Sequence, residues 1–142
     1  MWLRPLQKGA LGDTPITPPN LDVREMSFFS DDSLVFAAAA NSGAPQLFTV
    51  DPSGNVRLLD SGESRYPSVS PDGRWLAYGR QDRGVWNLWL MDLHTDETSR
   101  ITNEECNDIA PTWEADSQTL VFASDCGRAL WFTALHRRRV IP

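Results

Sequence analysis

Short apolar stretches alternate with turn-forming residues along most of this chain, and none carries an apolar stripe at helical spacing. The stretches are rich in Val, Leu, Phe, Trp and Tyr, which favour strands. Even the four alanines at 37–40 continue a strand pattern. The pattern therefore predicts an all-β chain. Second strands are expected at 34–38, 75–79 and 120–123, third strands at 47–50, 88–91 and 130–133, and fourth strands at 56–59, 100–102 and 139–141.

The same order of strands and turns occurs three times, at a spacing of about 42 residues. The clearest turn is Ser70-Pro71-Asp72-Gly73, in which proline presets φ and glycine tolerates a positive φ. Its counterparts lie at 29–33, where the turn is two residues shorter, and at 114–117. Apolar residues recur at matching positions, which predicts packing between neighbouring sheets. These positions are Phe29, Val69 and Trp113, then Phe36, Tyr78 and Phe122, then Phe48, Trp89 and Trp131.

A repeat of about 40–45 residues that holds four short strands is typical of a β-propeller blade. We therefore predict an all-β propeller with three four-stranded blades, at residues 22–64, 65–108 and 109–142. Residues 1–21 are rich in proline and glycine and show no periodicity of either kind. We interpret them as an extended arm or linker that supplies an edge strand around residues 2–6.

The segment from Ser70 to Tyr78 resembles the Pro-Asp blade repeat of TolB-like propellers, which are related to WD-repeat propellers. The third copy keeps Trp113 and Asp116 but has no proline or glycine in its turn, and the first copy keeps Ser30 and Asp32. The resemblance extends over all three copies. It implies a ring of six blades, of which this chain supplies three.

A propeller closes by packing its last blade against its first, so three blades alone would leave two apolar sheet faces exposed. Two explanations remain open. The chain is a fragment of a six-bladed domain in a larger protein, or two chains form a homodimer that completes the ring. We favour the homodimer, in which a two-fold axis relates the two halves of the ring and each chain gives three blades.

The charge of the chain narrows the choice of partners. The net charge is −6 and the isoelectric point is near 4.8, which makes nucleic acid a poor partner. The three arginines at 137–139 are interpreted as a solvated strand edge. No apolar run approaches the roughly 18 residues of a membrane-spanning helix, so no membrane span is expected. The N-terminus has no features of a signal peptide, and both periplasm and cytoplasm remain open as locations.

Cys106 and Cys126 are the only cysteines. In a propeller, the loop that leads into a blade lies on the same face as the loop between the second and third strands of that blade. Topology can therefore bring the two cysteines together. A disulfide in an oxidising compartment and two reduced thiols both remain open.

Metal and cofactor signals are weak. The two cysteines do not form a zinc spacing with His94 and His136. A group of oxygen-bearing residues near the cysteines suits calcium, but no Asp-x-Asp-x-Asp-Gly loop is present, so no metal or cofactor is predicted. This group contains Glu104, Glu105, Asn107, Asp108 and Asp125.

The chain has no Gly-x-Ser-x-Gly motif and is not predicted to be an enzyme. We predict a non-catalytic scaffold that binds a protein or peptide through a loop-rich face. The alternative is a supporting or sensor domain of a larger enzyme or transcription regulator. The loop sequences of the three copies differ from one another, which disfavours a lectin-like propeller with one ligand pocket in each blade. The predicted binding residues are Arg83, Trp86 (expected in a loop as the most exposed aromatic residue), Asp108, Asp125 and Arg128.

Overall fold

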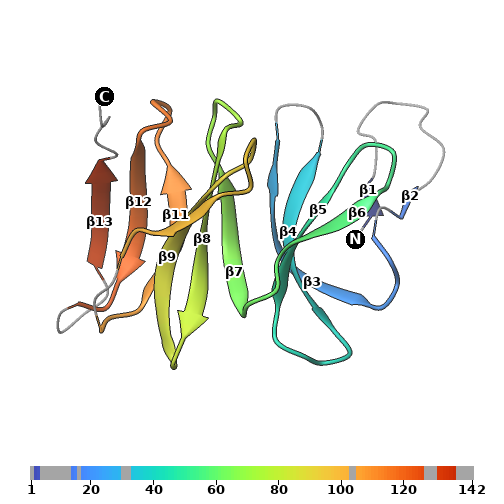
Figure 1. The fold of residues 1–142 in the computed structure, drawn as a ribbon, viewed down its shortest axis with the longest axis horizontal. Coiled ribbons are helices and arrows are strands. Elements are labelled where there is room, and N and C mark those ends of the chain that lie inside the picture. The colour runs from blue at the N-terminus through green and yellow to red at the C-terminus, as the bar shows by residue number, and fades with distance from the viewer. Residues whose placement is uncertain are drawn as a thin grey trace.

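The structure, a computed structural model, describes residues 2–3, 14–15, 17–29, 33–102, 105–126 and 131–136. Every regular element in these ranges is a β-strand, and the strands pair in antiparallel sheets (Figure 1). The all-β class predicted from the sequence is confirmed. Within the same ranges, no helix is long and apolar enough to cross a membrane.

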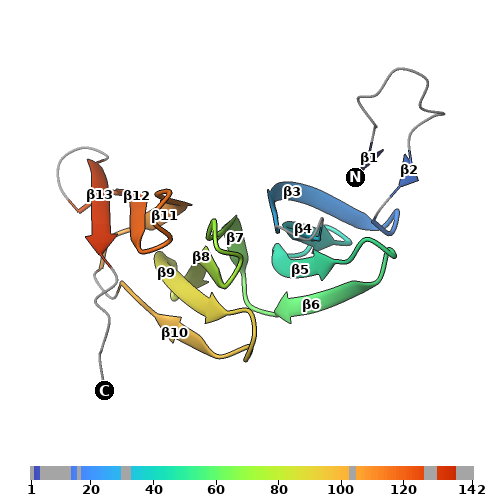
Figure 2. The same cartoon turned by 90° about the horizontal axis from the view of Figure 1, so that it is seen from above.

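Three of the sheets are consecutive blades, each built from strands that are adjacent in sequence. In Figure 2 the sheets radiate from β3, β7 and β11, the inner strands of the three blades, which is the arrangement of a propeller. The first blade contains β3 (Leu21–Phe28), β4 (Leu34–Ala40), β5 (Gln46–Val50) and β6 (Val56–Asp60). The second contains β7 (Ser64–Val69), β8 (Trp75–Asp82), β9 (Val85–Asp92) and β10 (Thr98–Arg100). The third contains β11 (Asp108–Trp113), β12 (Thr119–Ser124) and β13 (Trp131–His136).

Two predicted strand positions differ from the structure. The third strand of the second blade begins at Val85, so Trp86 belongs to β9 and not to a loop. A strand does lie within the predicted range 2–6, but this strand, β1 (Trp2–Leu3), pairs with β2 (Thr14–Pro15) in a separate two-stranded sheet and not with a blade. The strand predicted at 139–141 lies outside the described residues.

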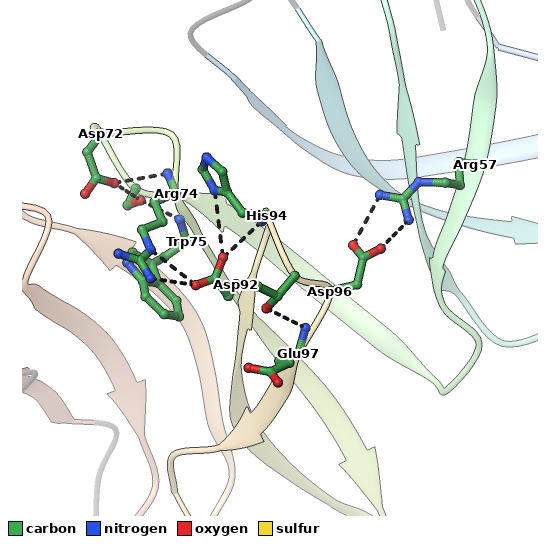
Figure 3. Close-up of polar contacts among 10 residues, drawn as sticks. Arg57, Asp72, Arg74, Trp75, Asp92, His94, Asp96 and Glu97 are labelled. Atoms are coloured by element: carbon green, nitrogen blue, oxygen red, sulfur yellow. Dashed lines mark hydrogen bonds and ion pairs between the residues drawn. The ribbon is translucent and has the colours of Figure 1, made fainter.

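The repeated turn is held by the side chains that define it. The Gly73 N–H donates to the Ser70 carbonyl at 2.8 Å, and Gly73 has a φ of 73°. Asp72 Oδ1 accepts hydrogen bonds from Ser70 Oγ at 2.5 Å and from the Arg74 N–H at 3.1 Å (Figure 3). In the third blade Ser117 adopts the positive φ, at 55°, and its hydroxyl accepts from the Asp72 N–H at 3.1 Å. The residue that replaces glycine therefore links two blades.

The strand register corrects the alignment of the first repeat. Phe28 pairs with Leu34, just as Val69 pairs with Leu76 and Trp113 with Leu120. The residue equivalent to Val69 and Trp113 is therefore Phe28 and not Phe29. The first turn contains five residues (29–33) against six (70–75 and 114–119), so it is one residue shorter and not two. Sequence alone placed the gap wrongly because this turn has neither proline nor glycine.

Two apolar cores lie between the blades. Leu76 and Tyr78 of β8 pack against the first blade, while Ala77 between them packs toward the third. This alternation follows from the period of two along a strand. In the second strands, the residues that face the blade before are bulky (Leu76 and Tyr78 in β8), and those that face the blade after are smaller (Val35 and Ala37 in β4, Ala77 in β8). The first core joins Val35, Ala37 and Leu47 to Leu76, Tyr78 and Met91, and the second joins Ala77 and Leu90 to Leu120.

Candidate protein- or peptide-binding face

Loops that lead into blades, and loops between second and third strands, gather at one end of the sheets. This end is lowermost in Figure 1, where the β8–β9 turn is its tip. We call it the binding face and define it by residues 41–45, 61–63, 83–84, 105–107 and 125–126. The predicted binding residues Arg83 and Asp125 lie on it and are exposed.

Trp86 is fixed at the rim of the binding face. Its backbone N–H donates to Asn107 Oδ1 at 3.1 Å. Its indole N–H donates to the side-chain oxygen of Gln81 at 3.2 Å, with the Gln81 amide oriented to donate to Glu63 at 3.0 Å. The indole also meets the ring of Tyr66 edge-on, with centroids 6.2 Å apart. Trp86 is half-buried and not the exposed loop residue that was predicted, because β9 begins one residue before it.

Tyr66 reaches Trp86 from a β-bulge in the inner strand β7. The register with β8 shifts between Arg65 and Ser68, and Tyr66 has a φ of 56°. Such a backbone costs about 1–3 kcal/mol for a bulky residue, so the surrounding structure must hold it. The Arg65 guanidinium lies 4.8 Å from the centroid of the Tyr66 ring and is also paired with Glu25 of β3. We call Arg65, Tyr66 and Trp86 the aromatic corner.

Sequence reasoning missed Arg65 and Tyr66. A signal was present, because Tyr66-Pro67 and Ala110-Pro111 occupy the same repeat position. Ala110 also has a positive φ, 53°, within a register shift of β11. A residue before proline at a repeated strand position therefore marked the bulge.

The loops that enter and cross the third blade are joined covalently. Cys106 and Cys126 form a disulfide. Beside it, Asn107 donates to both carboxylate oxygens of Asp125, through its backbone N–H at 2.6 Å and its side-chain amide at 2.8 Å. These bonds lower the pKa of Asp125, the side-chain bond most. Asn107 therefore ties the disulfide to Trp86, while the Asp125 carboxylate is partly occupied within the fold.

The other predicted binding residues, Arg83, Asp108 and Arg128, differ in their exposure and in whether the structure describes them. Arg83 and Gly84 form the two-residue β8–β9 turn, with φ values of 51° and 87°, and this turn projects Arg83 into solvent. Asp108 is the first residue of β11 and is 3% exposed, so its placement in an accessible loop was wrong. Arg128 lies outside the described residues. Among the described residues, no group of three or more potential metal ligands gathers.

The opposite end of the blades carries polar groups that already serve the fold (Figure 3). Asp92 accepts from the His94 N–H at 2.9 Å and from the Arg74 guanidinium at 2.9 Å, and the His94 bond contributes most to lowering the pKa of Asp92. Arg57 of β6 pairs with Asp96 at 3.0 Å and joins the first blade to the second. These contacts stabilise turns and blade junctions.

The chain is similar to several known proteins in sequence or in fold. No protein-family model matches the chain. The lasso peptide isopeptidase AtxE2 of Asticcacaulis excentricus is 32% identical over 116 residues, which are 80% of this chain and 16% of the isopeptidase. A protein described as TolB from Agrobacterium tumefaciens superposes with a TM-score of 0.78 at 18% identity, over 84% of this chain and 45% of that one. TolB from Acinetobacter baumannii superposes with a TM-score of 0.75 at 18% identity, over 88% and 32%.

The radial sheets and these superpositions define a β-propeller. More particularly, the chain has the TolB-like propeller fold, as the repeat around Ser70 implied. It spans less than half of each of the three proteins compared.

Proposed function

We propose that this chain is a non-catalytic propeller segment that binds a protein or peptide on the binding face. The observation that carries the proposal is the aromatic corner. Trp, Tyr and Arg are the residue types that most often dominate protein interfaces, and rigid anchors lose little entropy when they bind. Here Trp86 is held by hydrogen bonds through both its backbone and its indole N–H, so it is preorganised.

Arg83 extends this surface. It projects from the neighbouring turn with its guanidinium accessible, while Arg65 is engaged with Glu25 and Tyr66. An accessible guanidinium beside a half-buried aromatic pair suits a peptide that offers a carboxylate next to an apolar side chain. We therefore place the centre of binding between Arg83 and Trp86.

A second candidate rests on the identity to the isopeptidase. In this alternative, we infer that the three blades support a hydrolase domain in a longer protein, where they would help to hold a peptide substrate. The similar segment is only 16% of that enzyme, so such a role needs further domains. The coding sequence on either side of this segment in its gene distinguishes the two, because a hydrolase domain would be recognisable there.

The test of the proposed function uses a library of random linear peptides displayed on phage and selected on the wild-type chain. The affinity of the selected peptides is then measured for Arg83→Ala and Arg65→Ala. Each change should weaken binding about tenfold or more, because Arg83→Ala removes the accessible guanidinium and Arg65→Ala removes the cation that holds the Tyr66 ring. Arg83→Ala should leave the melting temperature unchanged.

Arg74→Ala is the matched control. Like Arg65, Arg74 stacks on an aromatic ring at 4.8 Å and pairs with a carboxylate, but it lies at the opposite end of the blades. It should not affect binding. Equal losses for Arg65→Ala and Arg74→Ala, or a failure to select any peptide, would contradict the proposal.

A further inference from the structure

The first blade carries an apolar face that no other blade covers. Strand register places Met26, Phe36, Phe48 and Leu58 in one row across all four strands. Phe36 and Phe48 stack in the middle of the row, with centroids 5.6 Å apart. The ends of the row are open, since Met26 is 47% and Leu58 46% exposed, and Phe28 in the next row is 60% exposed. Among the described residues, the exposed large hydrophobic side chains are these three, all on one face.

This face is equivalent to the faces through which the later blades contact the blade before them. Phe28 shares its register position with Val69 and Trp113. Val69 packs against the core between the first two blades. Trp113 packs against the core between the second and third, and its indole N–H donates to the Ser68 carbonyl at 3.0 Å. Phe28 therefore occupies a blade-contact position with no blade in front of it.

On its side away from the second blade, the third blade carries the type of face that the first and second blades turn to the blade after them. The residues of β4 that face the next blade are small, Val35 and Ala37, and Ala77 of β8 occupies the same kind of position. In β12 the equivalent residues are Val121 and Ala123, because Leu120 aligns with Leu34 of β4 and Leu76 of β8. No blade follows β13 in the described part of the chain. Within the described residues, the bulky face of the first blade and the Val121 and Ala123 side of the third blade, which we call the small-residue face, contact no other blade.

We propose that a second copy of this chain covers the open face of the first blade with the small-residue face of its third blade. A two-fold axis then forms the same junction twice and closes a ring of six blades. The occupant is assigned as a second copy because this chain already makes the equivalent blade-on-blade contact, with Val69 and Trp113 at the position of Phe28, at both of its internal junctions. This interface goes beyond the proposed binding function and does not depend on it.

The test is the native mass by light scattering over a range of concentrations. The wild-type chain should have twice the mass of one 15.9 kDa chain. Phe28→Asp and Val121→Asp should each weaken self-association about 100-fold or more, because each leaves an unpaired charge in an apolar junction. Ala44→Asp, in the exposed 41–45 loop, is the matched control and should stay dimeric.

Mixing the two variants tests the geometry of the junction. A pair made of one Phe28→Asp chain and one Val121→Asp chain has one unaltered junction and one doubly altered junction. The mixture should therefore recover dimers in part, although neither variant does so alone. If two first blades met face to face instead, Val121→Asp would remain dimeric, and that result would overturn the proposal.

Near-UV circular dichroism of the tryptophans checks that each variant is folded. If Val121→Asp does not fold, Thr112→Asp replaces it, because Thr112 pairs with Val121 across the strands and is exposed. A wild-type mass of one chain at every concentration overturns the proposal. The β1–β2 ribbon, which lies at the first-blade end in Figure 2, would then be the candidate cover for the open face. A mass above two chains also overturns it, since a closed ring has no free junction.

Discussion

Tyr78 and Asp60 form a buried polar link between the first two blades. The Tyr78 hydroxyl donates to Asp60 Oδ2 at 2.7 Å, and the same carboxylate accepts from Arg80 at 3.2 Å and from the Gly62 N–H at 2.6 Å. Tyr78 is fully buried. Burial raises the pKa of Tyr78 well above its ordinary value, and the hydrogen bond to Asp60 raises it further. One residue therefore contributes both apolar packing and a polar contact to the same junction.

This link predicts a loss of stability at alkaline pH. An unfolded tyrosine ionises near pH 10, so the contribution of Tyr78 is fully present below about pH 10 and decreases as the pH rises toward the higher folded pKa. Urea unfolding at several pH values should show a steeper fall above about pH 10 for the wild type than for Tyr78→Phe.

At neutral pH, Tyr78→Phe should lower the free energy of unfolding by about 1–2 kcal/mol, because a buried carboxylate loses one donor. Tyr66→Phe is the control, since Tyr66 takes no part in the Asp60 network, and it should keep the wild-type pH dependence. An identical pH dependence for wild type and Tyr78→Phe would exclude Tyr78 as the titrating group.

At the scale of elements, the disulfide joins two loops of the third blade, and Asn107 beside it contacts the second blade. Cys106 and Cys126 are 20 residues apart, and Asn107 lies next to the first of them. Because Asn107 accepts from the Trp86 N–H and donates to Asp125, the disulfide restrains β9 as well as the third blade. The position of the aromatic corner thus depends on a loop outside its own blade.

Removing the disulfide should therefore have a local and a global effect. Cys106→Ser with Cys126→Ser should lower the free energy of unfolding by about 3 kcal/mol, the usual cost of opening a loop of this length. Hydrogen exchange at the Trp86 amide should become faster because Asn107 is less restrained. Dithiothreitol should reproduce both effects in the wild type and change nothing in the double variant. Unchanged exchange at Trp86 would show that Asn107 holds its position without the disulfide.

At the scale of the whole molecule, only the second blade has both faces covered by other described blades. Leu76, Ala77 and Tyr78 of β8 are all fully buried. The bulky face of the first blade leaves Met26, Phe28 and Leu58 exposed, and the small-residue face of the third blade contacts no other described blade. In stacked repeats of this kind, stability is the sum of the intrinsic terms and the neighbouring interfaces, so the middle unit is the most stable.

Hydrogen exchange should follow this order. The amides of β8 should be the last to exchange, and those of β3, on the open first blade, should exchange sooner. If the ring is closed by a second copy, raising the protein concentration should protect β3 and β12 more than β8. Exchange at β3 as slow as at β8 under dilute conditions would show that the first blade is already covered within one chain.

Sequence alone identified the strands and the repeated turn because both depend on local chemistry. The sequence Ser70-Pro71-Asp72-Gly73 specifies its own hydrogen bonds, whatever surrounds it. Sequence reasoning misplaced residues whose position depends on pairing with a neighbouring strand. It placed Phe29 at the position of Phe28, and it placed Trp86 and Asp108 in loops, although both lie in strands.

The sequence by itself determined the class of fold, because three copies of one short pattern can bury their apolar residues only by stacking against each other. Only the tertiary structure decided that Tyr66 meets Trp86, that Asn107 links Trp86 to the third blade, and that Met26, Phe28 and Leu58 share one open face. The physical reason is distance along the chain. These contacts join residues about 20–30 positions apart, and they depend on bulges and register shifts that no local pattern specifies.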